Sequence, residues 1–184
     1  MTKFLKWLII LIPAIIIFVA LIVFAATPNK PTPKEKEKQF NTKDNRVTFT
    51  AYKSYKAEDR GEFDLYLNKD SKQVIGVFTY NLNEYEENSS KEILDKQISY
   101  YLERVSDIKL WKKEARYDME DKVITKVEYM GKTDKSDECV YVFAAIDFKA
   151  DSNYVLYVQE VISKNNYETQ IGEMNDILKS AKLN

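Results

Sequence analysis

The chain has 184 residues, of which 28 are basic and 29 acidic, and it contains no histidine and one cysteine. The absence of histidine excludes Ser-His-Asp and Cys-His catalysis and the usual zinc sites, and a single cysteine cannot form an internal disulfide. Residues 46–184 carry 21 basic against 26 acidic residues, and this acidic balance argues against a nucleic-acid partner, whose affinity depends on phosphate neutralisation.

The first 26 residues have the pattern of a membrane anchor. Lys3 and Lys6 lie in a short tail, residues 1–6, and an apolar run of 20 residues follows from Trp7 to Ala26. At about 1.5 Å rise per residue, a helix of that length crosses the roughly 30 Å hydrocarbon core of a bilayer. We therefore expect residues 7–26 to be a transmembrane helix whose partner is the lipid bilayer.

Cleavage and orientation of this segment stay open. The small residues near Ala26 are compatible with a cleaved signal peptide, which is the alternative to an uncleaved anchor. Lys3 and Lys6 favour a cytoplasmic N-terminus, whereas lysines after the run, such as Lys30, oppose it. Long C-terminal domains are translocated largely regardless of charge, so we expect a single-pass protein of the cell membrane with its domain outside the cytoplasm.

A segment rich in Pro, Lys and Glu, residues 27–45, follows the apolar run. It contains three prolines and the sequence Lys-Glu-Lys-Glu-Lys, with almost no apolar residue to bury. Such a composition does not offset the entropy lost on ordering, so we expect a linker here and one soluble domain over residues 46–184. A stiff linker would hold this domain away from the bilayer.

The domain begins with three strand patterns and a helix. Apolar and polar residues alternate over Val47–Tyr52 and Phe63–Asn68, and a third run covers Gln73–Tyr80. Ser89 and Glu92 then have the spacing of a capping box, which predicts a helix start. The apolar residues at helical spacing after this cap are Ile93, Leu94, Ile98, Tyr101, Leu102 and Val105.

Four further strand patterns follow, and their spacing favours an antiparallel meander. They cover Lys109–Tyr117, Lys122–Met130, Cys139–Phe148 and Tyr154–Ser163. Because Val140–Phe148 is apolar on both faces apart from Asp147, we expect a central strand, with the thiol of Cys139 buried at its start.

A final amphipathic helix is predicted over residues 166–182, with Asn165 and Glu168 as its cap. Its buried stripe consists of Ile171, Met174, Leu178 and Ala181. The complete order, βββ-α-ββββ-α, indicates an α+β fold class, in which an N-terminal transmembrane helix precedes one antiparallel-sheet domain with two helices packed against it.

This element order, together with the closing sequence Ile177-Leu178-Lys179-Ser180, resembles the PsbP-like family of α+β domains. The resemblance covers about Val47–Leu183. It implies an accessory or binding role and supplies no site residues. The early aromatic-proline pattern often found in that family is missing, because the domain contains no proline.

Three acidic clusters are candidates for a cation site, but their spacings match no calcium loop. They are Glu84, Glu86 and Glu87; Asp118, Glu120 and Asp121; and Asp134, Asp137 and Glu138. The first precedes a helix N-terminus, where negative charge is favourable in any case, and the others lie in predicted turns. We therefore predict no metal site and no cofactor.

Tyrosine supplies the one candidate binding face, because the chain has 13 tyrosines. Those expected on the outer faces of strands are Tyr52, Tyr66, Tyr129 and Tyr157. An exposed tyrosine face suits protein or glycan binding, because tyrosine offers contact area at a low entropic cost. The alternative is that helices cover these strands, in which case the tyrosines belong to the core.

No motif in the sequence carries a reaction, so we identify no catalytic residue. The layout favours a non-enzymatic, membrane-anchored, extracytoplasmic interaction domain whose partner is another envelope protein. The alternatives are a lipid or small-ligand binding domain, and a surface immunity or secretion accessory factor. The 24 lysines against four arginines fit an AT-rich bacterial genome.

Overall fold

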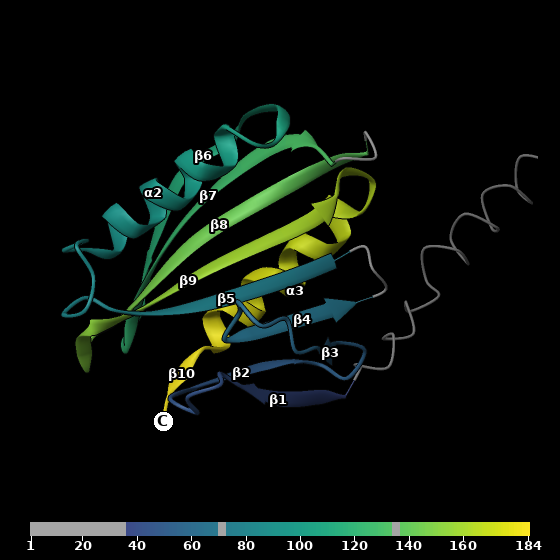
Figure 1. The fold of residues 1–184 in the computed structure, drawn as a ribbon. Coiled ribbons are helices and arrows are strands. Elements are labelled where there is room, and N and C mark those ends of the chain that lie inside the picture. The colour runs from purple at the N-terminus through teal and green to yellow at the C-terminus, as the bar shows by residue number, and fades with distance from the viewer. Residues whose placement is uncertain (1–35, 70–72, 134–136) are drawn as a thin grey trace, which may run out of the picture. The chain divides into compact units, whose positions relative to one another are not determined.

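The structure is a computed structural model that describes residues 36–69, 73–133 and 137–184 (Figure 1). The strands are β1 Glu37–Asn41, β2 Val47–Tyr52, β3 Lys56–Ala57, β4 Leu65–Lys69, β5 Gln73–Asn81, β6 Ser106–Asp118, β7 Lys122–Lys132, β8 Glu138–Phe148, β9 Asp151–Ser163 and β10 Lys182–Leu183. The helices are α2 Ser90–Leu102, the short 3-10 helix η1 Lys164–Asn166, and α3 Tyr167–Ser180. Within these ranges the predicted α+β class, with antiparallel sheets and two α-helices, is confirmed.

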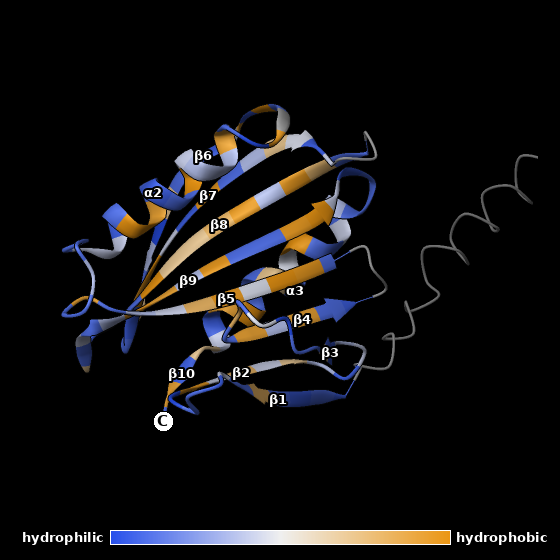
Figure 2. Cartoon of the chain, viewed as in Figure 1, coloured by the Kyte–Doolittle hydropathy of each residue, from blue (hydrophilic) through white to orange (hydrophobic). Residues whose placement is uncertain are grey.

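The strands form one large and one small sheet. The large sheet has the order β3-β4-β5-β9-β8-β7-β6, and the small sheet has the order β1-β2-β10. Strands β6 to β9 form the predicted antiparallel meander. Strand β8 lies between β7 and β9 with nearly all of its side chains buried, as its two-faced apolar sequence predicts. Figure 2 shows this apolar character along β8 and the polar character of β1.

Residues 36–45 belong to the fold, which corrects the predicted linker boundary. Strand β1 pairs with β2 from Glu37↔Tyr52 to Asn41↔Thr48, and Phe40 is buried in the core. The other four side chains of β1 are exposed, so its sequence resembles a solvated linker although its backbone is paired. The domain therefore begins at Lys36.

Residues 1–35, with the predicted tail, transmembrane helix and first part of the linker, lie outside the described residues. Neither α2 nor α3 has the length and hydrophobicity needed to cross a bilayer, and the described part of the chain holds no other candidate span.

The two α-helices pack on opposite faces of the large sheet. On β8, Tyr141 and Phe143 pack in the cluster that contains the buried side of α2, whereas Val142 packs with Tyr167 of α3. Because successive side chains of a strand point to opposite faces, each helix covers the residues that the other does not. Helix α3 also contacts β2 and so connects the two sheets.

The helix ends test the predicted caps. Ser89 is the N-cap of α2, and its hydroxyl accepts a hydrogen bond from the Glu92 amide at 3.2 Å, as predicted. The N-cap of α3 is Asn166, whose side chain makes no capping bond, so the predicted Asn165 cap is wrong. The reason is that η1 leads directly into α3 and leaves Asn166 in a helical backbone conformation, whereas an N-cap side chain needs an extended one.

Candidate interaction surface

The structure brings only part of the predicted tyrosine face together and covers much of it. Tyr157 is fully buried beneath α2, so its expected place on an outer face is wrong, and burial raises the pKa of its hydroxyl. Tyr129 is half-buried on the same sheet face and packs against Phe143, with ring centres 6.0 Å apart. The alternative interpretation of these two tyrosines, that they are core residues beneath a helix, therefore holds.

Tyr66 and Tyr52 lie elsewhere. Tyr66, on β4, contacts Phe63 with ring centres 5.1 Å apart and lies beneath the Arg60 guanidinium at 5.0 Å. Tyr52 belongs to the small sheet and lines a surface hollow of about 210 Å³ between β2 and α3. The four tyrosines consequently do not form one continuous surface.

The most exposed large apolar side chains on one strand belong to β6. Among the described strands, β6 is the outermost of the large sheet and pairs only with β7. Leu110, Trp111 and Tyr117 keep 50%, 37% and 39% of their surface exposed. We define the β6 edge surface as Lys109, Leu110, Trp111, Lys113, Arg116 and Tyr117.

The charge of the β6 edge surface is basic, although the domain as a whole is acidic. Each acid on the strand is paired with a lysine from another element: Asp107 with Lys132, Glu114 with Lys91, and Asp118 with Lys149. Within the described part of the chain, Lys109, Lys113 and Arg116 have no ion-pair partner. Positive charge is thus left over along the outer edge.

Neighbouring elements hold β6 in place. The Lys164 ammonium lies 3.3 Å from the Trp111 ring centre, and Lys112 donates a hydrogen bond to the Tyr167 hydroxyl of α3. The register with β7 shifts between Ser106 and Lys109, between Leu110 and Lys112, and again before Ala115. Such bulges re-aim side chains and interrupt the free backbone edge.

A hollow of about 450 Å³ adjoins the start of the β6 edge surface. Ile108, Met130 and Gly131 supply apolar lining, and the charges of Lys109 and Lys132 in the lining are balanced by those of Asp107 and Glu138. Gly131 is needed here because a Cβ at this position would lie 2.8 Å from the Val105 Cγ1 atom. The hollow has room for an inserted apolar side chain and is larger than one side chain needs.

Sequence reasoning recognised β6 as a strand but missed it as a surface. The usable signal is the sequence Lys109-Leu110-Trp111-Lys112-Lys113, because charged residues fall on both faces of the strand around two adjacent apolar residues. A strand covered on one side alternates polar and apolar residues instead.

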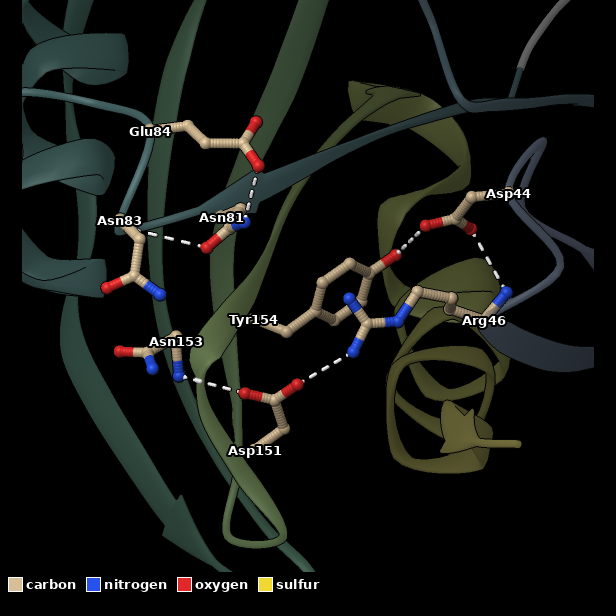
Figure 3. Close-up of polar contacts among 8 residues, drawn as sticks. All are labelled: Asp44, Arg46, Asn81, Asn83, Glu84, Asp151, Asn153 and Tyr154. Carbon is tan, nitrogen blue, oxygen red and sulfur yellow. Dashed lines mark hydrogen bonds and ion pairs between the residues drawn. The ribbon is translucent and has the colours of Figure 1, made fainter.

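A polar cluster at one end of the domain joins the small sheet to the large one (Figure 3). The Arg46 guanidinium lies 3.9 Å from the Tyr154 ring centre and donates a hydrogen bond to Asp151 at 2.7 Å. The Tyr154 hydroxyl donates to Asp44 at 2.6 Å. Burial opposes ionisation of Asp44, but hydrogen bonds from Thr42, Tyr154 and the Arg46 amide outweigh burial and lower the pKa of its carboxyl. The charged groups of this cluster pair with one another, so we assign it a structural role in holding the two sheets together.

A second polar cluster lies buried between the large sheet and α3. Lys126 Nζ is 2.8 Å from Glu128 Oε1 and donates to Asn175 Oδ1 at 2.8 Å. The Gln73 amide donates to Glu160 at 3.1 Å. Complete burial raises the pKa of the Glu160 carboxyl well above its ordinary value. A perturbed acid often marks a functional site, but Glu160 has no exposed surface with which to contact a ligand.

The remaining candidates from the sequence give no chemical site. Cys139 is buried, and burial together with the nearby Asp137 charge raises the pKa of its thiol, which makes it less reactive. In the described ranges, no group of three or more cysteine and carboxylate side chains is placed to hold a metal ion.

No protein-family model matches the sequence, and no curated protein matches it. Solved structures do share its fold. The structure of cyanobacterial PsbP (CyanoP) from Synechocystis matches with a TM-score of 0.58 at 7% identity, over 87% of this chain and 99% of that chain. LpqN of Mycobacterium tuberculosis, which is involved in cell envelope biogenesis, matches with a TM-score of 0.57 at 6% identity, over 80% of this chain and 90% of that chain.

The Ran-binding protein Mog1p of Saccharomyces cerevisiae matches with a TM-score of 0.53 at 10% identity, over 82% of this chain and 96% of that chain. Likeness at such identities concerns the fold. The domain therefore has the PsbP-like α+β fold that its element order indicated.

Proposed function

We propose that the chain is a single-pass membrane protein whose domain, residues 36–184, lies outside the cytoplasm and acts as a non-enzymatic interaction module. Its partner is another protein of the cell envelope. The observation that carries the interaction role is the β6 edge surface, where Leu110 and Trp111 remain 50% and 37% exposed. Of these two residue types, tryptophan is the one enriched at the centres of protein interfaces.

Two further observations support this role. The apolar run Trp7–Ala26 has the length of a bilayer span, which supports a location at a membrane. Proteins of the same fold include the Ran-binding protein Mog1p and LpqN, which is involved in cell envelope biogenesis. The absence of histidine removes the commonest general base of enzymes.

The alternative role, binding of a lipid or small ligand, has less support. The hollow between β2 and α3 holds about 210 Å³, whereas ligand pockets usually hold about 300–1,000 Å³. Three carboxylates, those of Glu37, Glu173 and Asp176, also line this hollow and disfavour an acyl chain there. The hollow beside β6 holds about 450 Å³, but four of its seven lining residues are charged, whereas ligand pockets are mostly apolar.

Site-specific photo-crosslinking in intact cells tests the interaction role. A photoreactive residue replaces Asp59, Leu110 or Lys179 in turn; these exposed positions lie in different parts of the domain. We expect discrete protein adducts from at least one position. If all three positions give only the background pattern, the interaction role fails.

The location is tested separately with a membrane-impermeant maleimide. A cysteine introduced at Asp59 is expected to react in intact cells, whereas the buried Cys139 provides the unreactive internal control. Reaction only after lysis would place the domain in the cytoplasm and contradict this part of the proposal.

A further inference from the structure

We propose that the β6 edge surface docks an acidic polypeptide segment that carries one apolar anchor side chain. This inference rests on the proposed interaction role and names the partner's chemistry and the place where it binds. Three features of β6 carry it: the surplus of positive charge, the exposed apolar pair Leu110–Trp111, and the adjoining hollow.

The charge surplus selects an acidic partner. Lys132, Lys91 and Lys149 already pair with the acids of β6, so Lys109, Lys113 and Arg116 form no ion pair of their own within the described residues, although Asp107 lies near Lys109, and Asp118 and Asp147 lie near Arg116. The domain as a whole carries a net negative charge, so an acidic partner is disfavoured by most of its surface and favoured at this edge. Complementary charge of this kind fixes the register of a complex and increases its rate of association.

The apolar residues supply the centre of the interface. Leu110 and Trp111 are adjacent in the chain and are flanked on both sides by basic residues. Leu110 lies opposite Tyr129, on the side of α2, whereas Trp111 contacts Lys164 of η1, so a partner that contacts both must wrap around the strand edge. The contact of Lys164 with the Trp111 ring fixes the indole before binding, so little side-chain entropy is lost on association. The neighbouring hollow, lined by Ile108 and Met130, receives the partner's anchor side chain.

Two other occupants fit this surface less well. A second copy of the chain would place the Lys109–Arg116 segments of two β6 strands against each other, and like charges across an interface cost several kcal/mol. The bilayer is the other anionic surface available. The chain enters the domain at Lys36, on the small sheet, whereas β6 is the edge of the large sheet farthest from it (Figure 1).

Docking occurs through side chains and not through addition of a strand. The register shifts divide the free edge of β6 into short pieces, and an added strand needs a continuous row of free backbone groups. A partner segment therefore needs acidic and apolar side chains, but it does not need β-strand propensity.

Fluorescence anisotropy with the full-length protein in detergent micelles tests the inference. The probe is a fluorescein-labelled peptide in which one central phenylalanine is flanked by glutamates. Matched probes carry lysine in place of every glutamate, or alanine in place of the phenylalanine. We expect the acidic probe to bind, the lysine probe not to bind, and the alanine probe to bind about tenfold more weakly. Raising the salt from about 0.05 M to about 0.5 M should weaken binding, because the charges are exposed.

Variants locate the binding. Leu110→Ala, Trp111→Ala and Lys113→Glu should each lower affinity for the acidic probe about tenfold. Lys179→Glu, at an exposed position of α3, makes the same charge change as Lys113→Glu and should leave the affinity unchanged. Because Lys113 is on the surface, Lys113→Glu should leave the thermal unfolding midpoint unchanged. An unchanged midpoint shows that the loss of affinity comes from lost contacts with the probe and not from unfolding.

Three results would overturn the docking site. One is equal binding of the acidic and lysine probes. Another is an equal loss of affinity in the Lys113→Glu and Lys179→Glu proteins. The third is that the β6 variants reduce binding to phosphatidylglycerol vesicles but not to the peptide, which would assign the edge to a membrane. Crosslinks from Asp59 or Lys179, with none from Leu110, would leave the interaction role in place and refute the β6 site alone.

Discussion

The two faces of the large sheet are both apolar in part but differ in the charged groups that they bury, although alternate residues of the same strands build them. The face beneath α2 is aromatic, with Tyr101 and Phe143 rings 5.1 Å apart and Tyr157 fully buried. The face beneath α3 has an apolar cluster that includes Ile146 and Leu178, and it also buries the ions Lys126 and Glu128; we call it the ionic face. An aromatic layer gains stability from buried area alone, whereas an ionic layer depends on every group keeping its partner. The two faces should therefore respond differently to mutation.

The largest expected loss follows from removing a ring on the aromatic face. Phe143→Ala should lower the free energy of unfolding by roughly 3–5 kcal/mol, because it removes buried area and leaves a cavity. Urea unfolding followed by circular dichroism measures this change. Tyr100→Ala, at a position 51% exposed, is the control and should change stability by no more than about 0.5 kcal/mol. Equal losses for both variants would contradict an aromatic core on this face.

On the ionic face, removal of one partner should cost nearly as much. Lys126→Met should destabilise the protein by about 3 kcal/mol, because it leaves the Glu128 carboxylate buried without its cation. Lys132→Met, which breaks the exposed pair with Asp107, should cost less than about 1 kcal/mol.

A double variant separates the cost of an orphaned charge from the value of the ion pair. Lys126→Met combined with Glu128→Leu should recover most of the stability, because an apolar pair often replaces a buried ion pair without loss. If the double variant is as unstable as Lys126→Met alone, the missing interaction is packing and not charge.

The helices that cover the two faces differ in their caps, and this difference has a smaller effect. Ser89→Ala should cost about 1 kcal/mol, because it removes the hydrogen bond from the Glu92 amide. Asn166→Ala should cost less than about 0.5 kcal/mol, since the Asn166 side chain makes no capping bond. Thermal unfolding of both variants at equal concentration measures the two losses of stability. The reverse order would mean that α3 has a side-chain cap in solution.

Glu160 makes the stability of the ionic face depend on pH. Replacing Glu160 should change the free energy of unfolding least in acid. Burial raises its folded-state pKa above the unfolded value, so its contribution to stability is fully present below the unfolded pKa and is lost as pH rises towards the folded pKa. Glu160→Gln removes this slope. The variant should match the parent protein near pH 4 and become relatively more stable at each higher pH in urea unfolding. Parallel stability curves for the two proteins would show that Glu160 titrates normally.

The sequence predicts the strands and helices of this fold better than its buried charges. Alternation identified β2 and β4, and the two-faced apolar run identified β8, because those strands are covered on at least one face. Lys126 and Glu128 flank Val127, and such a pattern predicts two solvated side chains on an alternating strand. They are buried only because α3 crosses that face, and the position of a helix far along the chain is not encoded in the local pattern.

The same reasoning explains the errors at the surface. The charges of β1 predict a linker, because backbone pairing with β2 leaves no mark on an exposed side chain. Tyr157 has the same residue type and alternation as an exposed strand tyrosine, and only the covering α2 buries it. The β6 edge surface was missed because strand order within a sheet depends on long-range pairing.

The small sheet also sets the order in which the domain can be completed. Strand β2 lies between β1 and β10, which are the first and last described strands of the chain. Strand β10 pairs with β2 through Lys182↔Thr48 and Leu183↔Val47. This pairing therefore cannot form until residues 182 and 183 have been synthesised. Contacts that join such distant segments form late and slow folding. A chain that emerges N-terminus first therefore holds β2 with one edge unpaired until its last strand is released, and that interval is when the domain is most open to chaperones and proteases.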